Sequence, residues 1–204
     1  NLTKKILIQN TFAEAFPMKA SRLIITAYSK KWALEAANSF TGFATSVIAC
    51  GCEAGIEYEL KSHETPDKRP GVSILVFSMS SKDLSRQIIN RTGQCIMTTP
   101  TSAVFSGNNG DIQLSLGNSL RYFGDGFQIS KIVGEKKYWR IPVMDGEFIC
   151  EDYAYQFNGI GGGNFLILGK NADSVLKACE LAVSEMNKLK NIILPFPGGV
   201  VRSG

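Results

Sequence analysis

The sequence is short of histidine: its 204 residues contain only His63, which lies in a polar stretch typical of a loop. Because imidazole is the usual base in serine and cysteine nucleophile mechanisms, a catalytic triad or dyad is disfavoured. The five cysteines lack the spacing of a disulfide framework, and no second close pair joins Cys50 and Cys52 in a zinc site. The sequence therefore predicts free thiols, a reducing cytoplasmic setting and no bound metal.

Long apolar runs are also missing. None approaches the ~18 residues that a bilayer-spanning helix requires, and the first residues lack the pattern of a secretory signal. Charge of either sign is moderate, with 22 Lys and Arg against 18 Asp and Glu and a net charge of +4. That excess suits anionic small molecules but gives no dense basic stripe. We therefore expect neither a membrane nor a nucleic acid as partner.

The first half of the chain does contain a regular alternation of element patterns. Strand patterns occupy residues 22–28, 44–49 with an extension at 56–60, 72–78 and 95–99, and helical spacing occupies 30–40 and 82–92. The order is β-α-β-β-α-β, typical of the ferredoxin-like split βαβ fold, in which two helices cover one face of an antiparallel sheet. The sequence predicts an α+β protein whose first lobe, with a C-terminal loop, spans residues 1–118.

The second half is predicted to be richer in strands. Strand patterns occupy residues 119–123, 138–143, 147–155, 164–168 and 191–196, with a long amphipathic helix at 172–189 and a further edge strand far upstream at 5–9. Residues 164–196 thus form one β-α-β series, and a second split βαβ unit would need another after it. Residues 119–204 are therefore predicted to be a strand-rich connection and the first half of an incomplete second ferredoxin-like lobe.

The stretch 39–55 contains one carboxylate, which is a candidate catalytic group. Glu53 lies between glycines in a predicted turn, directly after the predicted buried strand at 44–49. Such a position suits chemistry, although Glu53 as a surface acid, or as a cap for a neighbouring backbone amide, is the alternative interpretation. Asp125, between two glycines, has the pattern of a turn residue.

The glycine-rich stretch 159–163 does not match a nucleotide-binding loop. Its spacing departs from G-x-G-x-x-G, no Lys-Ser or Lys-Thr follows, and the stretch leads into a predicted strand rather than a helix. Close approach of a ligand or another chain to the backbone is the functional interpretation that stays open.

Taken in order along nearly the whole chain, several strings resemble formylmethanofuran:tetrahydromethanopterin formyltransferases. They are T-F-A-E-A-F at 11–16, T-G-F at 41–43, T-S-V-I at 45–48, E-A-G-I at 53–56, R-P-G-V at 69–72, G-Q-C at 93–95, F-G-D-G-F-Q at 123–128, G-G-N-F at 162–165 and F-P-G-G at 196–199. The resemblance implies two ferredoxin-like lobes, a homotetramer, and formyl transfer between the amine of methanofuran and N5 of tetrahydromethanopterin, without a metal or prosthetic group. Family members continue well past Gly204, which agrees with an incomplete second lobe and leaves open where a catalytic acid lies.

The resemblance also directs the assignment of site residues. Formyl transfer between two amines passes through a tetrahedral oxyanion, which needs hydrogen-bond donors and a proton carrier. We assign Glu53 as proton carrier or amine anchor, and the hydroxyls of Thr45 and Ser46 as donors. The other predicted substrate contacts are Arg22 and Arg69 (with Lys68) for anionic tails, Gln94, Asp125, and the segment Gly161, Gly162, Gly163, Asn164 and Phe165, whose first four amides are further candidate donors.

In its mild excess of basic residues, the chain resembles the family members of methylotrophic bacteria, in which the protein is a subunit of a formyltransferase/hydrolase complex. Other subunits of such a complex are therefore possible partners. Two alternatives to the enzyme remain: a non-catalytic scaffold subunit of that complex, and a small-molecule-binding regulatory module.

Overall fold

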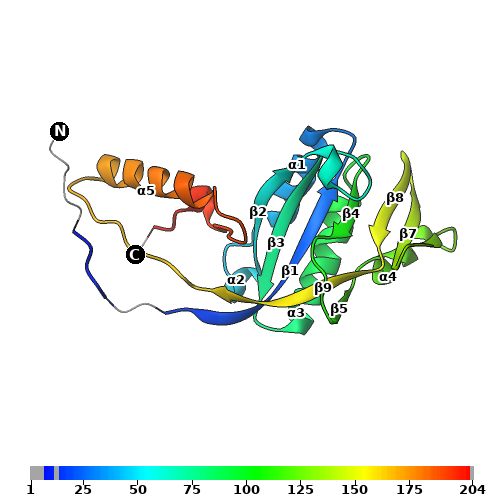
Figure 1. Cartoon of the computed structure of the whole chain (residues 1–204), viewed down its shortest axis with the longest axis horizontal. Coiled ribbons are helices and arrows are strands. Elements are labelled where there is room, and N and C mark those ends of the chain that lie inside the picture. Colours follow the sequence, from blue (N-terminus) through cyan, green and yellow to red (C-terminus); the bar gives the residue numbers. More distant parts are fainter. Residues whose placement is uncertain (1–6, 12–13, 203–204) are drawn as a thin grey trace.

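The computed structural model describes residues 7–11 and 14–202, and these form an α+β fold built on one nine-stranded mixed sheet (Figure 1). The α+β class is therefore confirmed. The main path of the sheet runs β2-β3-β1-β4-β8-β7-β6. Strand β9 lies beside that path and pairs with β1 and β5. The strands are β1 (Phe16–Thr26), β2 (Glu53–Leu60), β3 (Gly71–Ser78), β4 (Ala103–Ser106), β5 (Ile112–Ser115), β6 (Ile129–Val133), β7 (Lys136–Val143), β8 (Gly146–Glu151) and β9 (Tyr153–Gly161).

Two helices, α1 (Lys30–Thr41) and α3 (Ser81–Arg91), pack on one face of the sheet, as their spacing predicted. Each begins at a serine, Ser29 or Ser80, whose hydroxyl accepts a backbone N–H of the first turn. Their apolar faces meet buried strand side chains such as Leu23 in the main core. β3 is buried along its whole length because it lies between β1 and β2 and is covered on both faces.

The opposite face of the sheet, which we call the second face, carries a smaller apolar cluster. Met18, Ala20, Leu75 and Phe77 form it, and partly buried side chains that pack against it include Ile193. Ile193 follows α5 (Ala172–Met186), so the chain returns to the sheet after that helix (Figure 1). α5 itself stands away from the sheet and has no buried residue.

Three strand predictions are wrong because local helical contacts prevail. In the stretch 44–49, the Ser46 hydroxyl accepts the N–H of Ile48 and starts the short helix α2 (Val47–Cys50). Residues 95–99 lie instead in the π-turn Thr92–Ile96 and the turns after it, because the helical backbone continues past α3 and through Gly93. Residues 119–123 lie in α4 (Gly117–Leu120) and the 3-10 turn Arg121–Gly124.

Three further strands are absent from the part of the chain that the structure describes. Residues 164–168 and 191–196 form no ladder with any described strand, although the helix between them is confirmed over Ala172–Met186. Of the predicted edge strand at 5–9, residues 5 and 6 lie outside the described residues and 7–9 form no strand. A strand exists only where a neighbour accepts its hydrogen bonds, which an apolar run alone does not reveal.

No helix among the described residues is long and apolar enough to cross a membrane.

Candidate functional site

Glu53 does not lie in a turn: it begins β2 and pairs with Phe77 of β3. Paired residues of antiparallel strands share a face, so its side chain lies on the second face with that of Phe77. The carboxyl group is half-buried, and this burial raises the pKa of Glu53, although a hydrogen bond from the backbone of Val47 acts in the opposite direction. A raised pKa favours the protonated form of this carboxyl group, as a proton carrier requires.

The two predicted hydroxyl donors directly precede Val47, whose backbone binds this carboxylate, at the start of α2. The hydroxyl of Ser46 caps the helix, and the Oγ1 atom of Thr45 lies 3.8 Å from the Sγ atom of Cys50. Hydrogen bonds from the backbone of Ser46, together with Thr45 and the nearby Arg91, outweigh burial and lower the pKa of the Cys50 thiol. The structure thus brings Glu53, Thr45 and Ser46 into one neighbourhood and adds Cys50, which the sequence suggested only as a zinc ligand.

The glycine-rich segment ends strand β9 rather than leading into a strand. Gly161 pairs with Phe16 of β1, and Gly162 follows with a φ of +81°. A Cβ added to Gly161 would lie 2.0 Å from the Sδ atom of Met18, and one added to Gly162 would lie 2.7 Å from the Phe16 ring. The close approach expected here is therefore made by side chains of the same chain.

The end of the segment is open to solvent. Gly163 has no atom within 4 Å of an added Cβ, Asn164 donates from Nδ2 to the Gly162 carbonyl, and Phe165 is 63% exposed. Residues 162–164 are thus exposed, as a contact with a ligand requires.

The side chain of Arg22 forms hydrogen bonds with other residues of this chain. Its guanidinium donates to both carboxylate oxygens of Glu57, at 2.7 and 2.9 Å, and to the Oδ1 atom of Asn191 at 2.7 Å. The Glu57 side chain is fully buried. Burial raises its pKa, but hydrogen bonds from Arg22, the Asn191 backbone and Ser73 outweigh that effect, so the pKa of Glu57 is lowered. No pattern in the sequence connects Glu57 with Asn191.

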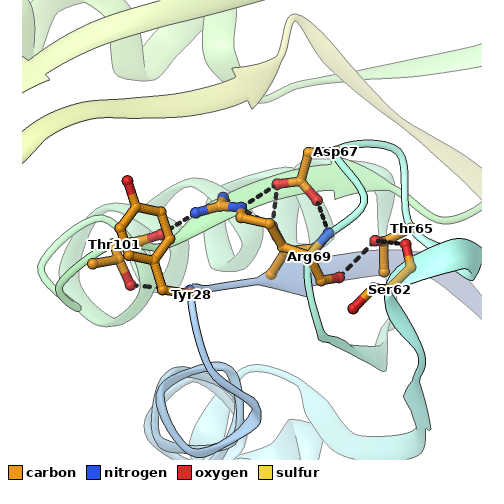
Figure 2. Close-up of polar contacts among 7 residues, drawn as sticks. Tyr28, Ser62, Thr65, Asp67, Arg69 and Thr101 are labelled. Carbon is orange, nitrogen blue, oxygen red and sulfur yellow. Dashed lines mark hydrogen bonds and ion pairs between the residues drawn. The ribbon is translucent and has the colours of Figure 1, made fainter.

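The side chain of Arg69 forms hydrogen bonds within this chain at the C-terminal end of β1 (Figure 2). Its guanidinium donates to Asp67 Oδ2 at 2.7 Å, to the Thr101 carbonyl at 2.6 Å and to Thr26 Oγ1 at 3.1 Å, and it lies 5.5 Å from the centre of the Tyr28 ring. Thr101 has a φ of +65°, which is unusual for a β-branched residue. Arg69 therefore joins the loop before β3 to a strained backbone position after the π-turn. Lys68 donates to the His63 carbonyl in the same loop.

Gln94 and Asp125 are exposed and lie in another part of the fold. Gln94 belongs to the π-turn after α3, and Asp125 ends the 3-10 turn after α4 with a φ of +48°. Figure 1 shows α2 near the middle of the molecule and α4 on the other side of β1 and β3, so the turn after α4 that holds Asp125 lies apart from α2. An open cavity of about 480 Å³ is lined by Met97 to Pro100, Phe123 and residues 141–145.

Within the described residues, no group of three or more His, Cys, Asp or Glu side chains is arranged to hold a metal ion. The five cysteines, all in that part of the chain, are free.

Comparison with known proteins identifies a family. The family described as "Formylmethanofuran-tetrahydromethanopterin formyltransferase" matches residues 2–143, and its part described as "FTR, proximal lobe" matches residues 146–204. The formylmethanofuran–tetrahydromethanopterin formyltransferase of Methylococcus capsulatus is 60% identical over 197 residues, and that of Archaeoglobus fulgidus is 46% identical over 198. The matches cover 97% of this chain and 66% and 67% of those relatives.

Two solved structures are similar along nearly the whole chain. The formyltransferase/hydrolase complex from Methylorubrum extorquens, solved with methylofuran, matches with a TM-score of 0.94 and 50% identity. The formyltransferase from Methanosarcina barkeri matches with a TM-score of 0.90 and 44% identity. The matches cover 97% and 96% of this chain and 66% of each matched chain, so the present chain spans about two thirds of their length.

Proposed function

Because the chain belongs to the formylmethanofuran–tetrahydromethanopterin formyltransferase family, we propose that its protein transfers a formyl group between methanofuran and N5 of tetrahydromethanopterin. The observation that carries the proposal is the identity of 60% and 57% to formyltransferases from two bacteria over nearly the whole chain. A TM-score of 0.94 to a complex that contains methylofuran supports it.

The chemistry requires a proton to move between two nitrogens. The accepting amine attacks the formyl carbon, the carbonyl becomes an oxyanion, and the bond to the donor nitrogen breaks as that nitrogen takes up a proton. We propose Glu53 as the carrier of this proton, since burial favours its protonated form. The hydroxyls of Thr45 and Ser46 and the amides of Gly161 to Asn164 are the proposed oxyanion donors.

The other predicted substrate contacts stay predictions. Arg22 and Arg69 already donate hydrogen bonds within the chain, to Glu57 and to the Thr101 carbonyl. They can bind anionic substrate tails only through guanidinium N–H groups that these hydrogen bonds do not use.

Gln94 and Asp125 are exposed and lie within three residues, along the chain, of Met97 and Phe123, which line the open cavity. Phe165 is exposed after β9, where a bound pterin or furan ring can reach it.

We also propose that the first lobe is ferredoxin-like and that residues 119–204 begin a second lobe of that kind. The strand order β2-β3-β1-β4 with antiparallel pairing at each step supports the first part. The exposed apolar side chains of α5 support the second, because an amphipathic helix is stable where its apolar face is covered. A homotetramer, as the family resemblance implies, is part of the same proposal.

A second candidate is a role within a larger assembly. A relative from Methylorubrum extorquens, named as one of the subunits of the formyltransferase/hydrolase complex, is 49% identical over 205 residues. We propose that the present protein joins a similar complex, either as its formyltransferase or as a scaffold.

A direct assay separates these candidates. Formyl transfer from formylmethanofuran to tetrahydromethanopterin is measured with the product of the complete gene and with residues 1–204 side by side. Turnover by the gene product supports the enzyme, and a Glu53→Gln variant is expected to lose about 100-fold or more in rate. Full activity of that variant would remove Glu53 from the mechanism, and a folded gene product without turnover would favour the scaffold.

A further inference from the structure

The chain after α5 returns to the second face of the sheet near β2 (Figure 1). We call residues 190–194 the strap. They form no secondary structure, so specific contacts must hold them in place. Two such contacts exist, one polar and one apolar.

The polar contact centres on the buried carboxylate of Glu57. Its Oε2 atom accepts from Arg22 Nε at 2.7 Å and from the Ser73 hydroxyl at 2.9 Å. Its Oε1 atom accepts from Arg22 Nη2 at 2.9 Å and from the backbone N–H of Asn191 at 2.8 Å. Because a buried charge is costly unless it is fully paired, the carboxylate needs the strap as its fourth donor.

Asn191 is held at two points. Its backbone N–H binds Glu57, and its Oδ1 atom accepts from Arg22 Nη2 at 2.7 Å. Its φ of +66° lies in the left-handed region, which asparagine tolerates better than most residues. The strap therefore presents both a donor and an acceptor to the same ion pair.

The apolar contact lies two residues along β2. Ile193 packs over Gly55, where an added Cβ would lie 2.9 Å from the Ile193 Cβ atom. Ile193 also packs against the small cluster that contains Leu75 and Phe77. The bare backbone of Gly55 thus makes the seat into which Ile193 fits.

We propose that the Arg22–Glu57 pair is a clasp that, together with the Gly55 seat, fastens the strap to the second face and opens while the sheet stays folded. Apart from Asn191 and Ile193, every member of the two contacts belongs to β1, β2 or β3, and the ladders of these strands do not involve the strap. α5 has no buried residue, so the clasp also fixes where that helix is attached. On this view Arg22 also positions a segment of its own chain.

Hydrogen exchange followed by mass spectrometry tests the clasp. Asn191→Gly keeps the left-handed backbone and the N–H that binds Glu57 but removes the acceptor for Arg22. We expect amides of residues 190–196 to exchange at least about 10-fold faster, with those of β1 and β3 changed by less than about 2-fold. The control is Asn158→Gly, which removes an exposed hydrogen bond to Lys19 elsewhere on the sheet.

Gly55→Ala tests the seat without touching the ion pair, with Gly163→Ala as control because an added Cβ meets nothing there. The same acceleration confined to residues 190–196 is expected. The proposal is overturned if the strap exchanges at the wild-type rate in both variants. It is equally overturned if β1 and β3 lose protection together with the strap, since the network would then support the sheet as a whole.

Discussion

Glu53 and Glu57 lie four residues apart on β2, and their surroundings act on the two carboxyl groups in opposite directions. Glu53 has burial without a cationic partner, which raises its pKa. Glu57 has burial with Arg22, Ser73 and a backbone N–H as partners, which lowers its pKa. Residue type alone therefore does not distinguish a proton carrier from a structural anion, whereas the partners do.

Glu53→Gln is expected to stabilise the fold at neutral pH. A carboxyl group with a raised pKa binds its proton more tightly in the folded state, so its contribution is fully present below the ordinary value of about 4.3 and is lost as pH rises through the folded pKa. The neutral amide removes this loss. Thermal unfolding at pH 7 and at about pH 3.5 checks it, and a gain at neutral pH that is equally large in acid contradicts it.

Gly161→Ala should destabilise the protein by about 1–3 kcal/mol, since the new methyl group meets the Met18 Sδ atom at 2.0 Å. Gly163→Ala, in the same proposed donor segment, has free space and should change stability by less than about 0.5 kcal/mol. Urea unfolding of both variants measures the difference. Equal midpoints for the two would show that Met18 moves aside without cost.

At the scale of elements, Arg69 joins three segments that are remote in sequence. Arg69→Ala removes hydrogen bonds to Asp67, Thr26 and the Thr101 carbonyl at once, and we expect a loss of at least about 2 kcal/mol. Arg140→Ala, which removes an exposed pair with Glu147, should cost less than about 1 kcal/mol. Denaturant unfolding compares them, and a change in substrate KM without a change in stability would assign Arg69 to binding instead.

Long periodic segments were predictable from the sequence, and short apolar runs were not. The helices at 30–40 and 82–92 were predicted within one or two residues, because their spacing and serine caps act locally. The apolar run at 44–49 has the pattern of a strand, although Ser46 caps a helix there. The site was predictable only in part: the neighbourhood of Glu53, Thr45 and Ser46 follows from chain proximity, whereas the partnership of Glu57 with Asn191 spans 134 positions and leaves no local signal.

At the scale of the whole molecule, packing is unevenly distributed between the sheet and α5. α3 contributes buried Leu84 and Ile88 to the main core, whereas no residue of α5 is buried and Leu176 and Leu181 are 54% and 71% exposed. An isolated helix of about 15 residues is only marginally stable in water. α5 in this chain therefore depends on its own hydrogen bonds and on the strap that follows it.

Hydrogen exchange should reveal this division directly. In residues 1–204, amides of α5 are expected to exchange at least about 100-fold faster than those of α3, which is of similar length but packs on the sheet. Two surface ion pairs, Lys177 with Asp173 on α5 and Lys188 with Glu185 at its C-terminal end, contribute too little to offset the missing burial, since exposed pairs are worth about 0.2–1 kcal/mol. If α5 is instead as protected as α3, another surface must cover its apolar side in solution. Repeating the measurement over a range of protein concentrations then decides whether a second copy of the chain supplies that cover.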